Sequence, residues 1–104
     1  MQIALDKLPG RAVLDATGLL LGRIKEPLVD TETWLVDTLR LKVTRHVADE
    51  LGLIWTWMFW KRPTIDVRSG LVQAAGDAIL LRVSLGELRD AAEPTGEQHL
   101  PPIH

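Results

Sequence analysis

Hydrophobic and polar residues alternate over residues 35–44, which is the most regular pattern in the chain. Leu39, Leu41 and Val43 fall on one face and polar side chains on the other, as in a strand with one buried face. Less regular apolar runs of strand type occupy residues 11–15, 19–29, 63–67 and 77–83. Glycine and proline separate the runs at short intervals. The pattern therefore predicts an all-β fold of short strands.

The second and third runs are predicted to form a hairpin about residues 30–33, whose aspartate and threonine side chains can bond nearby backbone amides. This pairing places Ile24 opposite Leu39 and Gly22 opposite Leu41. Because side chains alternate between faces, a slip of one residue would invert every face. Proline cannot donate to a ladder, so the proline at position 27 is expected at an edge or a bulge.

The other face of this hairpin is predicted to carry a basic patch, made up of Arg23, Lys25, Arg40 and Lys42. Such a patch can contact nucleic-acid phosphates, but an ordinary solvated strand face is favoured because the net charge is −2. The same register sets Glu26 opposite Asp37, a like-charge pair that would raise the pKa of one carboxyl group. A bulge at Pro27 that separates the two is favoured over an acid–base role.

Two short helices are predicted where the spacing of apolar residues changes from that of a strand to that of a helix. Residues 45–53 have apolar side chains at helical spacing, and Gly52 suits a C-terminal cap. Residues 84–90 begin with Ser84, a favourable N-cap, and form a closing helix. Residues 68–76 are interpreted as a connector.

The stretch LIWTWMFWKRP, residues 53–63, holds three of the four tryptophans and the only phenylalanine. As a strand it would be apolar on both faces, and a chain of 104 residues has limited room to bury it. A surface patch that mediates self-association is favoured. Core packing, membrane contact and base stacking remain alternatives. The predicted interaction surface consists of Ile54, Trp55, Trp57, Met58, Phe59, Trp60, Lys61 and Arg62.

Composition narrows the function classes. The chain contains no cysteine, so disulfides and thiolate chemistry are excluded, and its three histidines lack ligand spacing. We therefore expect no metal, no cofactor and no catalytic site. No secretion signal or membrane-spanning run is recognisable, so a cytoplasmic location is expected. The length fits one domain over residues 1–90, followed by a flexible, proline-containing tail over residues 91–104.

The order of the apolar runs and glycines resembles the PRC-barrel family over about residues 8–90. The family is named for a domain of the photosynthetic reaction-centre H subunit and includes the C-terminal domain of a ribosome-maturation factor. Short stand-alone archaeal members are the most similar, through TWLVDTLRLKV, VADELGL and SLGEL. The opening motif is carried by Gly10, Val13, Asp15, Gly18, Leu21 and Gly22, and a later AxGDxIxL motif by residues 74–81.

The resemblance implies a small antiparallel β-barrel of the PRC type, with a short helix before the aromatic stretch and another at the C-terminus. Gly18 and Gly22 suit a turn and a tight bend, and Gly76 a second turn before Asp77 leads into the last strand. The aromatic stretch is not part of the shared pattern.

The function expected from this resemblance is a non-catalytic adaptor or scaffold. Such a protein would homodimerise and mediate protein–protein interaction with an unidentified partner, such as a cell-division or other multiprotein assembly. An RNA- or ribosome-associated maturation role is the first alternative, and a peripheral membrane module is the second. Both rest on fold-level analogy.

Overall fold

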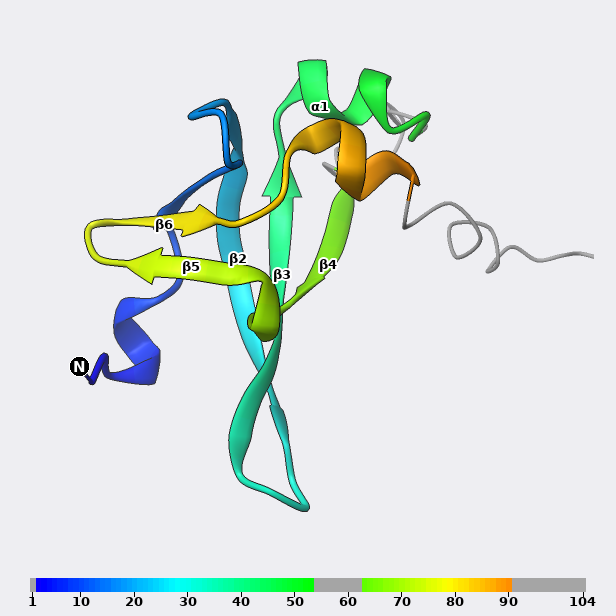
Figure 1. Ribbon diagram of the computed structural model, residues 1–104. Helices are drawn as coiled ribbons and strands as arrows, with labels where there is room; N and C mark the ends of the chain where they lie inside the picture. The colour runs from blue at the N-terminus through cyan, green and yellow to red at the C-terminus, as the bar shows by residue number, and fades with distance from the viewer. Residues whose placement is uncertain (1, 54–62, 91–104) are drawn as a thin grey trace, which may run out of the picture.

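Six strands form one sheet in the order β4-β3-β2-β1-β6-β5 in the computed structural model, which describes residues 2–53 and 63–90 (Figure 1). The pair β1–β6 is parallel, and every other neighbouring pair is antiparallel. The strands are β1 (Ala12–Leu14), β2 (Leu20–Asp30), β3 (Leu35–Val43), β4 (Thr64–Arg68), β5 (Val72–Ala75) and β6 (Ala78–Leu81). The helical elements are η1 (Leu5–Lys7), α1 (Arg45–Glu50), η3 (Ser69–Leu71) and residues 85–90.

The predicted β-rich class is confirmed, and so are the two short helices. The sheet is mixed rather than wholly antiparallel, because β1 and β6 run in the same direction. Within the described residues it does not close into a barrel, since β4 and β5 are its two end strands. Figure 1 shows the β5–β6 pair lying across β2 and β3, so the sheet folds over on itself. The predicted closed antiparallel barrel is thus only partly correct.

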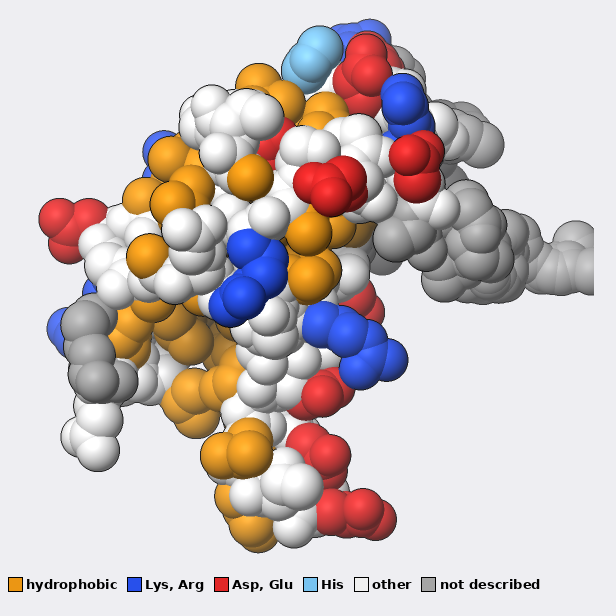
Figure 2. Space-filling view, in the orientation of Figure 1, with side chains coloured by type: hydrophobic (Ala, Val, Ile, Leu, Met, Phe, Trp, Pro, Cys, Tyr) orange, Lys and Arg blue, Asp and Glu red, His pale blue; other side chains and the backbone are white. Residues whose placement is uncertain are grey.

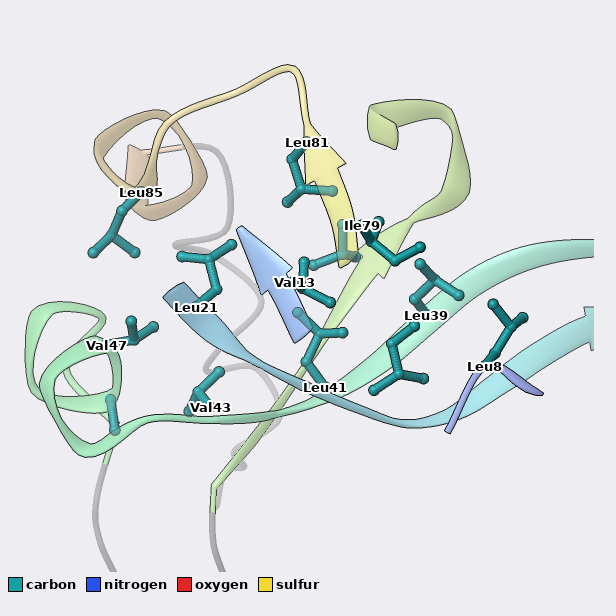
Figure 3. Packing of buried hydrophobic residues seen from close by; sticks show 13 residues of the cluster. Leu8, Val13, Leu21, Leu39, Leu41, Val43, Val47, Ile79, Leu81 and Leu85 are labelled. Carbon is teal, nitrogen blue, oxygen red and sulfur yellow. The ribbon is translucent and has the colours of Figure 1, made fainter. Parts of the chain in front are cut away.

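The core fills the space between the two halves of this folded sheet. Side chains from β1, β2, β3 and β6 point toward one another in Figure 3. Val13, Leu21, Leu41 and Leu81 are fully buried there, and Val47 of α1 joins them. Strand alternation explains this arrangement, because every second residue of each central strand faces inward.

The β2–β3 hairpin forms as predicted, but its register differs by two residues. Ile24 pairs with Leu41, not Leu39, and Gly22 pairs with Val43. Asp30 pairs with Leu35, so the loop spans residues 31–34 and not 30–33. Moving a turn by one residue shifts the register by two, which leaves Ile24, Leu39 and Leu41 on their predicted inner face. The bulge between Ile24 and Glu26 adds a third residue to the shift and brings Glu26 opposite Arg40 on the other face.

Pro27 lies beside a bulge, as expected. The register of β2 against β3 shifts between Ile24 and Glu26, immediately before the proline. Strand β1 pairs with β2 only as far as Arg23, so Pro27 lies where β2 has β3 as its one neighbour. The missing N–H of proline therefore removes no ladder bond.

The prediction of residues 68–76 as a connector was wrong, because this segment contains a strand. Residues 68–76 contain η3 and the end strand β5, which pairs with β6 through a two-residue link at Gly76 and Asp77. The segment VQAA shows almost no alternation, and three of its four residues are exposed. Pairing with the strongly apolar β6, and not its own pattern, makes it a strand.

Both helices are capped, and the predicted caps Gly52 and Ser84 are in place. Thr44 accepts a 3.2 Å bond from the amide of Val47 at the start of α1, and Gly52 follows α1 with a φ of 73°. Ser84 and Glu87 form a reciprocal capping box, each side chain accepting from the other residue's amide. An ion pair of 3.6 Å between Arg89 and Glu50 joins the two helices at one end of the sheet.

The glycines predicted to be structural behave differently from one another. Gly18 has a φ of 91°, which suits the turn between β1 and β2. At Gly22 the neighbouring strand is so close that a Cβ would collide with the backbone of Lys42 and Val43. Gly76 does lie in a turn, but nothing lies within 4 Å of the position a Cβ would take.

Candidate interaction surfaces

A row of alternating charges crosses the outer face of β2, β3 and β4. Arg40 of β3 pairs with Glu26 on one side and Asp66 on the other. Its guanidinium lies 3.0 Å from a carboxylate oxygen of each. The hydrogen bonds and negative charge of Asp66, reinforced by Glu26, raise the pKa of Arg40. The register that set Glu26 opposite Asp37 was therefore wrong, and Glu26 faces a cation.

The predicted basic patch is only partly assembled. Arg23 and Lys42 are cross-strand partners on the outer face, and Lys25 is exposed at the bulge. Arg23 donates to the carbonyl of Gly10 at 3.0 Å. Arg40, the fourth member, lies between two carboxylates that offset its charge. The outer face is thus of mixed charge, which weakens its attraction for phosphates.

Asp15 is the one buried charged side chain of the described residues, with 2% of its surface exposed. Its Oδ1 accepts bonds from the amides of Thr17 and Leu19, both at 2.9 Å, and from the Thr17 hydroxyl at 2.7 Å. Its Oδ2 accepts from the amide of Leu85 at 2.9 Å. Burial raises the pKa of Asp15, but these bonds outweigh it and leave the pKa below its ordinary value. This carboxylate is occupied in holding the fold.

The predicted aromatic interaction surface, residues 54–62, lies outside the described residues. Its flanks are placed: Leu53 is half-buried after α1, and Pro63 precedes β4. The carbonyl of Pro63 accepts a 3.2 Å bond from the amide of Val43. Self-association through this stretch stays a prediction.

The β2–β3 hairpin projects from the rest of the molecule (Figure 1). We call residues 28–38 the hairpin tip. It carries the two most exposed large hydrophobic residues of the described chain, Trp34 at 75% and Leu35 at 66%. Figure 2 shows hydrophobic and acidic side chains side by side at the end of this projection. The tip therefore presents apolar surface to solvent at the point farthest from the core.

The described ranges, 2–53 and 63–90, contain no recognisable metal centre. No group of three or more histidine, aspartate or glutamate side chains gathers there in a way that could hold a metal ion. His46, the described histidine, lies exposed on α1. In the same ranges, no helix is long and apolar enough to cross a membrane.

No protein-family model matches the chain, and no curated protein is significantly similar to it.

Trp34 is the residue that sequence reasoning missed. No role is predicted for it from the sequence, which places the exposed aromatic surface in the stretch after residue 53. The signal was present, since a tryptophan directly follows a polar turn sequence, DTET, in a predicted hairpin. A large apolar side chain beside a hairpin loop has little core within reach.

Proposed function

We propose that this chain is a non-catalytic adaptor that binds other proteins through apolar side chains displayed on a β-sheet scaffold. The observation that carries this proposal is the exposure of Trp34 and Leu35 at the end of the projecting hairpin. Exposed neighbouring apolar side chains cost solvation free energy, and tryptophan is enriched at the energetic centres of protein interfaces.

The remaining surface supports the same conclusion. On the outer face, Glu26, Arg40 and Asp66 are engaged with one another. The buried carboxylate of Asp15 has its acceptor positions filled by backbone and hydroxyl donors. Neither arrangement offers a group poised for acid–base chemistry.

The PRC-type fold and homodimerisation belong to this proposal. The tight approach at Gly22 and the turn at Gly18 support the fold assignment, since both glycines belong to the motif that carries the resemblance. Self-association is assigned to the aromatic stretch, residues 54–62, because three tryptophans exceed what a small core needs.

Sedimentation equilibrium tests self-association. We expect the wild type to be a dimer, and the double substitution Trp55→Ser with Trp57→Ser to weaken that dimer. A wild type that is monomeric at high micromolar concentration would reject self-association.

The adaptor role is tested by comparing two exposed leucines. The full chain is immobilised and exposed to an extract of its native host, and the retained proteins are quantified. Leu35→Ser is expected to lose the specific set, whereas Leu5→Ser, a change at a 48% exposed leucine on η1, is expected to keep it. Equal retention by both variants would contradict a role for the hairpin tip in binding.

A further inference from the structure

The loop at the end of the hairpin is held in one shape by its own hydrogen bonds. The amide of Trp34 donates to the carbonyl of Asp30 at 2.7 Å, and the amide of Glu32 donates to the Asp30 carboxylate at 2.8 Å. The amide of Leu35 donates to the hydroxyl of Thr33 at 3.3 Å. A loop with its amides satisfied in this way is preorganised, so less entropy is lost when it binds.

The backbone at Trp34 is strained. Its φ of 60° is left-handed, and it is the one non-glycine residue of the described chain with a positive φ. Glycine and asparagine are the usual occupants of this conformation, which costs other residues about 1–2 kcal/mol. Since the side chain is 75% exposed, packing within this chain offsets little of that cost. Glycine would adopt the left-handed conformation that this loop needs without the cost, so a tryptophan at this position points to a role outside the fold.

The charged residues of the hairpin tip have one sign. The hairpin tip contains Asp30, Glu32 and Asp37 and no lysine, arginine or histidine. Figure 2 shows the acidic side chains beside the hydrophobic ones at this end of the molecule. The hairpin's cations lie outside the tip: Arg23 and Lys42 are opposite each other near the other end of the two strands, and Arg40 is between Glu26 and Asp66. Lys25 is at the bulge, and Arg68 of β4 pairs with Thr38 at the base of the tip. We call the three carboxylates of the tip the acidic collar.

The acidic collar favours some classes of binding partner over others. Anionic lipid surfaces and nucleic-acid backbones would be repelled by three carboxylates around the apolar side chains. Two hairpin tips meeting in a symmetric dimer would bring both collars together, which is unfavourable for the same reason. A protein surface with positive charge around an apolar pocket is complementary to the tip in both charge and polarity.

We propose that the hairpin tip is a docking element for a basic protein surface, with Trp34 and Leu35 entering an apolar pocket rimmed by arginine or lysine. Asp30, Glu32 and Asp37 pair with the rim cations and orient the hairpin. The apolar pair supplies most of the affinity, and the collar supplies association rate and selectivity. This inference rests on the proposed adaptor function and specifies its partner.

The partner surface is identified by placing a photo-cross-linking residue, p-benzoylphenylalanine, at position 34 of the full chain. After irradiation in native-host extract, mass spectrometry locates the cross-linked peptide in the partner. The partner is then purified and titrated with the unmodified chain at low and high salt. We expect the cross-linked site to be flanked by arginine or lysine, and the affinity to fall at least about tenfold as salt screens the charges.

Two variants of equal charge provide the control. The collar variant carries Asp30→Asn, Glu32→Gln and Asp37→Asn, and the change at position 30 retains a side-chain oxygen that can accept from the amide of residue 32. The matched variant neutralises three exposed carboxylates elsewhere through Asp6→Asn, Asp49→Asn and Asp77→Asn. The collar variant is expected to bind the partner at least about tenfold more weakly, and the matched variant within about twofold of the wild type.

The outcomes separate this inference from the proposed function. A partner protein that binds through position 34 with equal affinity for the wild type and the collar variant would overturn the basic-pocket inference and leave the adaptor role standing. A cross-link to an acidic or neutral protein site would do the same. Cross-links to nucleic acid, to lipid or to a second copy of the chain would also overturn the inference. No cross-linked protein at all would overturn both.

Discussion

Asp15 and Leu85 join the turn between β1 and β2 to the helix over residues 85–90. The Oδ2 atom of Asp15 accepts a 2.9 Å hydrogen bond from the Leu85 amide, across seventy residues of sequence. The other carboxylate oxygen holds the loop between β1 and β2 through Thr17 and Leu19. One buried charge thus satisfies a helix N-terminus and a tight turn, and both are otherwise left with unpaired donors.

Asp15→Asn is expected to lower the free energy of unfolding by about 2–3 kcal/mol, because asparagine offers one oxygen where the carboxylate uses two. The NH₂ group of the asparagine would replace one of the two accepting oxygens. It would then face an N–H donor, either the amide of Leu85 or the amides of the turn, and neither could form a hydrogen bond with it. Urea denaturation measures the change. Asp77→Asn, at an exposed aspartate, serves as the control, and an equal effect of the two substitutions would contradict the role assigned to Asp15.

The stability that Asp15 supplies should depend on pH with a definite sign. The folded-state pKa of Asp15 lies below its ordinary value of 3.8, which applies to the unfolded chain. Its contribution is therefore fully present above pH 3.8 and is lost as the pH falls through the folded pKa. The difference in unfolding free energy between wild type and Asp15→Asn should shrink in this range. A difference that grows as the pH falls would be contrary to the account.

Gly22→Ala tests the close approach of β2 to β3. A Cβ at this position would collide with the carbonyl oxygen of Lys42 and lie 2.8 Å from the Cα of Val43, both backbone atoms that cannot rotate away. We expect a loss of about 3 kcal/mol or failure to fold, measured by thermal denaturation. Gly76→Ala is the matched control, because nothing lies within 4 Å of its Cβ position. Comparable melting temperatures for the two variants would rule out the predicted clash.

The two carboxylates beside Arg40 should suppress nucleic-acid binding. With its charge offset by Glu26 and Asp66, the outer face is expected to bind single-stranded RNA weakly even at low salt. Glu26→Gln with Asp66→Asn would expose the positive charge and raise the affinity, as measured by fluorescence anisotropy. Tight binding by the wild type that falls on Lys42→Ala would instead favour the RNA-associated alternative.

The inward face of the hairpin could be predicted from sequence because alternation determines faces independently of the loop. Ile24, Leu39 and Leu41 are buried as expected, although their partners differ by two positions for Ile24 and Leu41 and by three for Leu39. The loop position could not be predicted, since it depends on Trp34 adopting a conformation that tryptophan normally avoids. The same unusual residue therefore explains both the misplaced loop and the missed surface.

Contacts between residues far apart in the sequence could not be predicted either. Asp15 appeared in a recognisable motif, but its bond to Leu85 depends on the fold bringing residue 85 back to the first turn. Strand β5 has no alternation of its own and becomes a strand by pairing with β6. The expected bulge next to Pro27 does separate Glu26 from Asp37, but the sequence alone does not show that it sets Glu26 opposite Arg40. Local patterns describe faces and caps, whereas pairing is decided by the whole chain.

Trp34→Gly, with stability and partner binding measured on the same preparation, tests the central claim most directly. Glycine accommodates the left-handed backbone, and little buried surface is lost from a side chain that is 75% exposed. The account predicts an unfolding free energy that is unchanged or higher by about 1 kcal/mol, together with at least about a tenfold loss of affinity for the partner. A marked loss of stability, or unchanged binding, would show that Trp34 serves the fold rather than a partner.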